Sequence, residues 1–221
     1  MNSATEIVSR SQHWAMGEDA AVLAEIYDET INIALWQRAL GNDVQRYVDQ
    51  LLQHNKSISI KLAASPTKLM EEIQRIFPAT ISSQGAADLS AAAFYEDVYL
   101  VLDMFACLFD ATEIGLRINT LERAMCPRFH KDNVAVRLVT TYAGPGTEWL
   151  SSAQVSSATN NSTVSDRSIH FDPVDKQSTT AGTIALLKGE RWEGNEGRGI
   201  VHRSPEVQAP PRRLLLTCDL L

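Results

Sequence analysis

The segment that decides the fold is Met125–Tyr142, MCPRFHKDNVAVRLVTTY. A Cys-Pro pair precedes His130 and Asp132, and the chain then enters an apolar run that predicts a buried strand. On an extended segment, the side chains at positions i and i+2 point to the same face. The spacing therefore places an imidazole beside a carboxylate, which is half of a metal site that needs a third ligand.

The third ligand is expected on a later strand, and His202 in GRGIVHRSP is the candidate. The long interval after His130 leaves room for several strands, which return the chain to the same place in a closed or rolled sheet. Two histidines and one carboxylate form the facial triad of non-haem Fe(II) sites, which leaves other positions on the metal open. His170 and Asp172 form a second His-x-Asp pair and are the alternative ligands, although Pro173 ends their strand at once.

Three further residues near these ligands have side chains suited to a site. Arg212 and Arg213 open the last strand-like run, RRLLLTCDLL, shortly after His202. An arginine there can bind a carboxylate through two parallel hydrogen bonds. Cys126, just before His130, is either an accessory ligand, which would favour Zn(II), or a small buried apolar residue.

The composition excludes some functions. The chain has 221 residues, 44% of them hydrophobic, and a formal net charge of −7. This charge argues against binding to nucleic acid, which depends on Lys and Arg contacts with phosphates. No apolar run approaches the length of a membrane span, so we expect no membrane insertion. Three cysteines and an N-terminus without an apolar signal segment predict a cytoplasmic protein.

The two halves of the chain differ in their periodicity. Residues 1–112 are predicted to be mainly helical, with helices within 17–40 and 86–108. Residues 113–221 contain short strand-like runs bounded by Gly, Pro and Ser, which predict a sandwich or barrel. The Ser/Thr/Asn-rich segment 151–168 is a candidate lid. We therefore predict an α+β fold in which the helical part packs on the β core and is not independent of it.

The pattern of His130, Asp132, a distal His202 and an arginine about ten residues later resembles the Fe(II)/2-oxoglutarate-dependent dioxygenases. The similarity covers roughly residues 113–221. It implies a double-stranded β-helix, the jelly roll of cupin-like proteins, with helices before it. It also implies that the three residues ligate Fe(II) and that 2-oxoglutarate is the cosubstrate.

The same resemblance implies how 2-oxoglutarate is held. Arg213, or else Arg212, would bind its far carboxylate. Arg213 is preferred because Thr217 lies four positions on and shares its face. Tyr142, after the first strand of the core, would contact the cosubstrate.

A second likeness spans most of the chain. LRINTLERAMCPRFHKD, TYAGPGTEWL and GIVHRSP are similar to domain-of-unknown-function family 1826, an uncharacterised bacterial family. This likeness implies no activity. Three functions therefore stay open: an Fe(II)/2-oxoglutarate oxygenase, a cupin-like accessory protein that handles zinc without 2-oxoglutarate turnover, and a non-catalytic interaction module.

Overall fold

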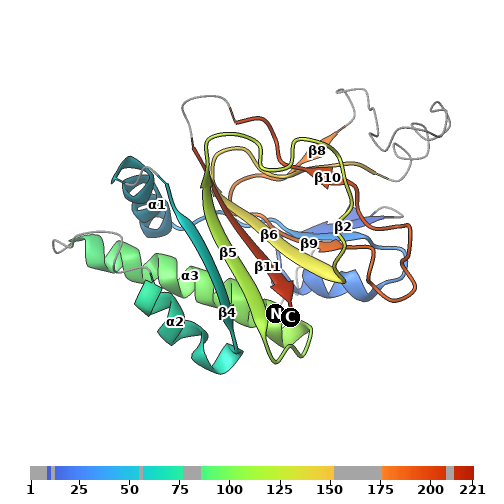
Figure 1. Ribbon diagram of the computed structural model, residues 1–221, viewed down its shortest axis with the longest axis horizontal. Coiled ribbons are helices and arrows are strands. Elements are labelled where there is room, and N and C mark those ends of the chain that lie inside the picture. The colour runs from blue at the N-terminus through green and yellow to red at the C-terminus, as the bar shows by residue number, and fades with distance from the viewer. Residues whose placement is uncertain (1–8, 11–12, 55–56, 77–85, 152–175, 208–211) are drawn as a thin grey trace, which may run out of the picture.

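The computed structural model describes residues 9–10, 13–54, 57–76, 86–151, 176–207 and 212–221, and it combines helices with two β-sheets (Figure 1). The α-helices are α1 (Asn42–His54), α2 (Leu69–Ile76) and α3 (Ala86–Leu108), and the 3-10 helices are η1 (Ala20–Tyr27) and η2 (Pro66–Lys68). Among the helices in these ranges, none has the length and apolar character to span a bilayer.

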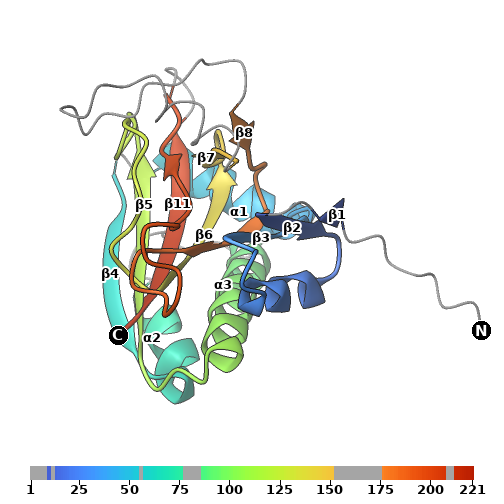
Figure 2. The same ribbon diagram turned by 90° about the vertical axis from the view of Figure 1, so that its right-hand side faces the viewer.

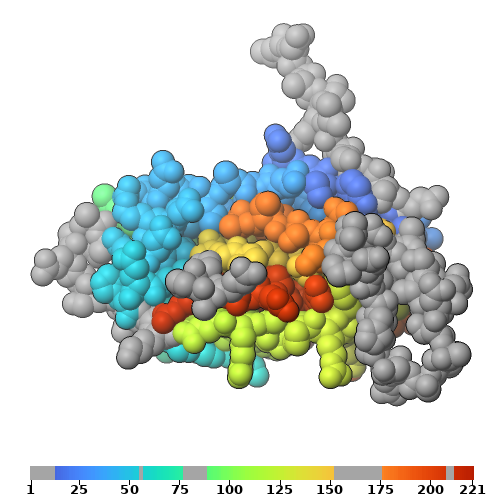
Figure 3. All heavy atoms as spheres, turned by 90° about the horizontal axis from the view of Figure 1, so that it is seen from above, coloured from blue at the N-terminus to red at the C-terminus, as the bar shows by residue number. Residues whose placement is uncertain are grey.

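The large sheet contains eight strands in the order β1-β2-β3-β9-β6-β11-β5-β4, and the small sheet has the order β10-β7-β8. Neighbouring strands are antiparallel except β2 and β3, which are parallel. Figure 3 shows β9, β6, β11 and β5 as successive bands across one side of the molecule. The strands are β1 (Ser9–Arg10), β2 (Trp14–Gly17), β3 (Ile33–Trp36), β4 (Ser59–Ala64), β5 (Ile114–Leu121), β6 (Val136–Ala143), β7 (Glu148–Trp149), β8 (Gln177–Ser178), β9 (Ile184–Lys188), β10 (His202–Arg203) and β11 (Arg213–Leu220).

Strand β11 shows how the two faces of the large sheet differ, because its side chains alternate between them. Leu214 and Leu216 belong to the main buried cluster, which also contains Phe94 of α3. We call this side the helix face, and Figure 2 shows α3 against it. Leu215 belongs to a second buried cluster that contains Trp149 of the small sheet. The side that carries Arg213 and Leu215 is the site face.

The register between β6 and β11 contains an irregularity at the end of β6. Leu214 pairs with Ala143, whereas Leu215 pairs with Thr141, so β6 has one extra residue, Tyr142, at this point. Such a bulge leaves the extra residue unpaired and disrupts the ladder locally. Tyr142 packs on the helix face with Val136 and Leu138, as strand alternation requires, while Thr141 lies beside Arg213 on the site face.

The helix predicted within residues 17–40 is wrong in part. Only Ala20–Tyr27 is helical, and Ile33–Trp36 forms β3 between β2 and β9. Ile33, Ala34 and Leu35 are all buried, since this strand is covered on both faces. A strand covered on both faces has a continuous apolar run rather than an alternating one, and periodicity alone does not distinguish such a run from a helix. The large sheet thus takes β1 to β4 from the first 112 residues.

Candidate metal centre

The backbone holds two of the predicted ligands against each other. His130 precedes β6, and it forms an isolated antiparallel bridge with His202 of β10. The bridge has two hydrogen bonds of 3.0 Å, from His130 N to His202 O and from His202 N to His130 O. The two imidazole rings lie with their centroids 4.6 Å apart. The main chain therefore sets the spacing of the two rings.

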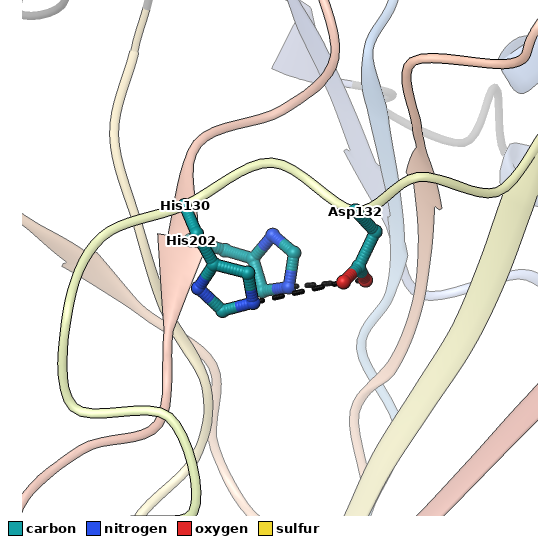
Figure 4. A group of neighbouring side chains, drawn as sticks. All are labelled: His130, Asp132 and His202. Carbon is teal, nitrogen blue, oxygen red and sulfur yellow. Dashed lines mark ion pairs between the residues drawn. The ribbon is translucent and has the colours of Figure 1, made fainter. Parts of the chain in front are cut away.

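Asp132 completes the cluster, as Figure 4 shows. Its Oδ1 lies 3.6 Å from His130 Nε2, and its Oδ2 lies 3.3 Å from His202 Nε2. One nitrogen or oxygen atom from each of the three residues lies within 4.8 Å of the other two. The structure thus brings together the three side chains that the sequence pattern singled out, from two segments far apart in the chain.

Each imidazole ring has its tautomer set by a backbone carbonyl. His130 Nδ1 donates to Arg128 O at 2.9 Å, and His202 Nδ1 donates to Ile200 O at 3.1 Å. Because a carbonyl oxygen only accepts, each Nδ1 carries a proton, which leaves Nε2 of each ring facing Asp132. A protonated Nε2 can donate to Asp132, and an unprotonated Nε2 offers its lone pair to a cation in the proton's place. This donor set fits a divalent metal ion with ring orientations already fixed by outer hydrogen bonds.

The pKa values of two of these groups agree with such a site. Burial alone would raise the pKa of Asp132, but hydrogen bonds with His130 and His202 outweigh burial and hold the pKa well below its usual range. The hydrogen bond with Asp132 raises the pKa of His130 despite burial. The carboxylate is therefore ionised at neutral pH and ready to ligate a cation.

A chain of ion pairs on the site face holds Asp132 in place. Arg137 Nη1 donates to Asp132 Oδ2 at 2.7 Å, and its Nε and Nη2 donate to Asp219 at 2.6 and 2.9 Å. Arg117 Nη1 donates to Asp219 Oδ2 at 2.6 Å. Asp219 is buried, so its bonds to both arginines are well shielded from water. These bonds tie the carboxylate of Asp132 to β6, β11 and β5.

Arg213 is a buried cation whose hydrogen-bond partners are all neutral. Its side chain is only 1% exposed, and it donates to Thr147 Oγ1 at 2.9 Å, Thr141 Oγ1 at 3.1 Å and Ser204 Oγ at 3.2 Å. Within the described part of the chain, its Nε has no hydrogen-bond partner. Among the described residues, no carboxylate forms an ion pair with Arg213. Burial lowers the pKa of this guanidinium to about 10.

The hydroxyl groups around Arg213 connect it to the metal cluster. Ser204 follows His202 by two residues along β10 and the adjoining loop. Thr147 precedes Trp149 by two residues, and Trp149 pairs with His202 in the small sheet. The guanidinium therefore reaches across to the segments that carry and flank His202, one of the candidate ligands.

Two of the predicted cosubstrate contacts need correction. Tyr142 lies on the helix face, where its hydroxyl donates to Asp97 Oδ2 at 2.7 Å, so its side chain points away from Arg213. Strand alternation is the reason, because Tyr142 shares a face of β6 with Val136 and Leu138, which belong to the same buried cluster. Arg212 also points elsewhere, donating to Leu52 O at 3.2 Å.

The other predicted residues are placed as follows. Thr217 lies on β11 four residues after Arg213, opposite Arg117 and Val139, and it shares the site face. Cys126 is exposed, and the cluster of candidate ligands in the described part of the chain does not include it. The alternative ligands, His170 and Asp172, and nearly all of the candidate lid 151–168 lie outside the described residues.

Sequence reasoning missed the residues that support the ligands and Arg213. They are Asp219 beside Arg137, and Thr141, Thr147 and Ser204 beside Arg213. A signal existed for Arg137: it alternates with Val136 and Leu138, so it projects from the face opposite the helices. The hydroxyl residues had no comparable signal, because Ser and Thr at turns and strand ends are common.

Comparisons with known proteins place the fold. Among solved structures, the chain resembles the dioxygenase for auxin oxidation 1 of Arabidopsis thaliana in its 2-oxoglutarate complex, with a TM-score of 0.54 and 10% identity over 96% of this chain and 92% of that one. It also resembles JOX2 in complex with 2OG, Fe and JA, with a TM-score of 0.50 and 10% identity over 99% of this chain and 77% of that one. At these identities the likeness shows the fold, the double-stranded β-helix of 2-oxoglutarate oxygenases.

Among curated proteins, no sequence matches this chain. The family model described as "Protein of unknown function (DUF1826)" matches residues 17–219, which is most of the chain and includes all three candidate ligands. The chain therefore belongs to the DUF1826 family.

Proposed function

We propose that this protein is an Fe(II)/2-oxoglutarate-dependent oxygenase that works in the cytoplasm. His130, Asp132 and His202 would hold the metal through two imidazole nitrogens and one carboxylate oxygen. Three protein ligands on one face of Fe(II) leave the other positions open for cosubstrate and oxygen. When bound, Fe(II) and 2-oxoglutarate supply the oxidising chemistry, with decarboxylation of 2-oxoglutarate to succinate.

The observation that carries this proposal is the buried, uncompensated charge of Arg213. A cation removed from water is costly unless an anion is paired with it. Among the residues that the structure describes, Arg213 has only hydroxyl partners, and its Nε has none. Each hydroxyl that accepts from the guanidinium keeps its own proton to donate. Arg213 and its neighbours thus form a set of donors for one carboxylate, and a dicarboxylate could reach from there to the metal.

Other residues of the chain would position the reactants and exclude water. Arg137 holds the ligand carboxylate through Asp132 Oδ2, which steadies the remaining oxygen. The buried cluster of Val139, Leu215 and Ile200 lies on the site face between the two sheets. An apolar surround of this kind strengthens ion pairs inside the site because it lowers the local dielectric.

The similar structures support the cofactor assignment, since one was solved with 2-oxoglutarate and another with 2OG and Fe. The zinc-handling alternative lacks support of this kind. Thiolate ligands favour zinc, whereas Cys126 is exposed and outside the cluster. The ligand set of two imidazoles and one carboxylate suits iron without any thiolate.

Metal titration tests the proposal first. Protein freed of metal and kept without oxygen is titrated with Mn(II) as a stable substitute for Fe(II), and then with 2-oxoglutarate. We expect one metal ion per chain in the wild type and a large loss of metal affinity in Asp132→Ala. Cys126→Ser is the control and should bind metal as the wild type does.

Fe(II)-loaded protein with oxygen should then convert 2-oxoglutarate to succinate slowly even without substrate. Absence of 2-oxoglutarate binding at millimolar concentrations would overturn the oxygenase proposal. Metal binding without it would leave a cupin-like metal protein as the better description.

A further inference from the structure

Two cations stand opposite each other at the edge of the site face. Lys61 on β4 pairs in register with Arg117 on β5, and directly opposed residues share a face of the sheet. On its other side, Arg117 pairs with Thr217 of β11, which lies on the site face. Lys61 and Arg117 therefore extend the face that carries Arg213 outward to the end of the large sheet.

Both side chains are accessible to solvent, and both have N–H groups that could donate to a ligand. The side chain of Arg117 is 39% exposed, and Lys61 is exposed. Within the described part of the chain, Arg117 uses only Nη1, and Lys61 forms no ion pair. The next pair along the strands, Ser59 and Asn119, is also polar, and Ser59 Oγ lies 3.1 Å from Asn119 Oδ1. Figure 3 shows atoms of β5 at the surface.

The charges nearby leave an excess of positive charge. Asp219 already accepts two hydrogen bonds from Arg137 and one from Arg117. Asp132 would be committed to the metal. Like charges placed directly across two strands repel each other. An anion bound between Lys61 and Arg117 would remove that repulsion.

The distance from this pair to the metal centre suits a small molecule. Asp219 Oδ2 accepts from Arg117 Nη1 at 2.6 Å and from Arg137 Nη2 at 2.9 Å, and Arg137 Nη1 lies 2.7 Å from Asp132 Oδ2. These contacts place the guanidinium of Arg117 on the order of 10 Å from the ligand carboxylate. At about 1.5 Å per bond, a small molecule with a chain of roughly seven bonds covers that distance.

We infer that Lys61 and Arg117 bind the anionic group of the substrate, and that this substrate is a small organic acid whose far end lies beside the metal. The inference rests on the proposed function for the metal centre. It assigns opposite ends of β11 to the two acids, with the cosubstrate at Arg213 and the substrate toward Asp219. The positively charged edge selects for a carboxylate over a neutral compound of the same shape.

Ligand-observed NMR with phenylacetate and hexanoate, each compared with its neutral amide, tests the inference. We expect both acids to bind metal-free protein and Mn(II)/2-oxoglutarate-loaded protein at least tenfold more tightly than their amides. Lys61→Gln and Arg117→Gln should each weaken the acids by roughly three- to tenfold, as for loss of a partly exposed charge-assisted bond. Lys68→Gln removes an exposed lysine on η2 and should leave the affinity for both acids unchanged. In the loaded protein, Mn(II) should broaden the probe signals.

Any of the following results would overturn the inference: equal binding of acids and amides, no binding of either acid up to tens of millimolar, or a Lys61→Gln protein that behaves like Lys68→Gln. If the acid were held at Arg213 instead, the Lys61→Gln protein would also behave like Lys68→Gln, so this result includes that alternative. Lys61 lies on an edge strand and is exposed, so its substitution tests the site even if Arg117→Gln disturbs Asp219. If Mn(II) or 2-oxoglutarate does not bind, only the proposed function is refuted, because the measurements on metal-free protein still test the anion site. If Mn(II), 2-oxoglutarate and the acid all bind but Mn(II) does not broaden the signals of the acid, only the inference is refuted.

Discussion

Replacing Arg213 by alanine should weaken 2-oxoglutarate binding about 100-fold and leave metal binding unchanged. Burial lowers the pKa of this guanidinium from 12.5 to about 10, which corresponds to a cost of about 3 kcal/mol for keeping the cation buried. Arg213 is charged at neutral pH in both the folded and the unfolded chain, so the cost is present in full and declines only above pH 10. A bound carboxylate would offset this cost, and about 3 kcal/mol corresponds to roughly 100-fold in affinity.

Calorimetric titration of Mn(II)-loaded protein with 2-oxoglutarate, run without oxygen, measures this effect. Arg212→Ala is the matched control, because Arg212 is the neighbouring residue and points to Leu52. Arg213→Met separates binding from folding, since it keeps an unbranched side chain and removes the charge. It should weaken 2-oxoglutarate as alanine does, while the ligand-free protein melts at or above the wild-type temperature.

Any of three results would refute the reasoning. A wild-type affinity in Arg213→Ala would show that the buried charge has no role in binding the cosubstrate. A large loss of 2-oxoglutarate affinity in Arg212→Ala, with none in Arg213→Ala, would mean that the carboxylate binds on the other face of β11. A ligand-free Arg213→Met protein that melts well below the wild type would mean that the hydroxyl contacts already offset burial of the cation.

Three further predictions concern the scaffold. Tyr142→Phe should leave 2-oxoglutarate affinity unchanged and lower the free energy of unfolding by about 1 kcal/mol, because it loses only the bond to Asp97; denaturant titration checks this. Burial would raise the pKa of Glu148, but bonds from Lys176 and Arg203 lower it below its ordinary 4.5, so the carboxylate adds stability that is lost as pH falls through the depressed pKa. Glu148→Gln should therefore melt below the wild type at pH 7, and the difference should shrink in acid. Residues 113–221 expressed alone should show no cooperative thermal transition, because the large sheet includes four strands from the first part of the chain.

The candidate ligands could be found from the sequence because their signal is local chemistry. His130 and Asp132 are two residues apart, so their proximity needs no knowledge of the fold. His202 required a return of the chain after many residues, and the fold supplies this through the bridge between the two histidines. The preference for Arg213 over Arg212 came from the resemblance, whose arginine is followed four positions later by a threonine on the same face, and the structure places Arg213 on the site face.

The errors have two sources. Alternation along VRLVTTYA places Tyr142 on the face of Val136 and Leu138, away from Thr141, whereas its predicted contact with the cosubstrate came from the resemblance alone. Strand β3 is buried on both faces, so its apolar run resembled part of a helix. The ion pairs of Asp219 depend on three strands lying side by side, which is knowledge of topology rather than of sequence.

The two main-chain hydrogen bonds between His130 and His202 fix where the candidate ligands stand, whichever side chains occupy the two positions. The bonds use only N–H and C=O groups, so a change of side chain at either position leaves the spacing intact. One donor side chain can therefore be exchanged for another without rebuilding the architecture. If the proposed metal site is correct, a glycine in place of Asp132 would open a coordination position for an exogenous anion while the two imidazoles keep their places. The main chain of this protein thus fixes where the donors stand, and the side chains decide which donors they are.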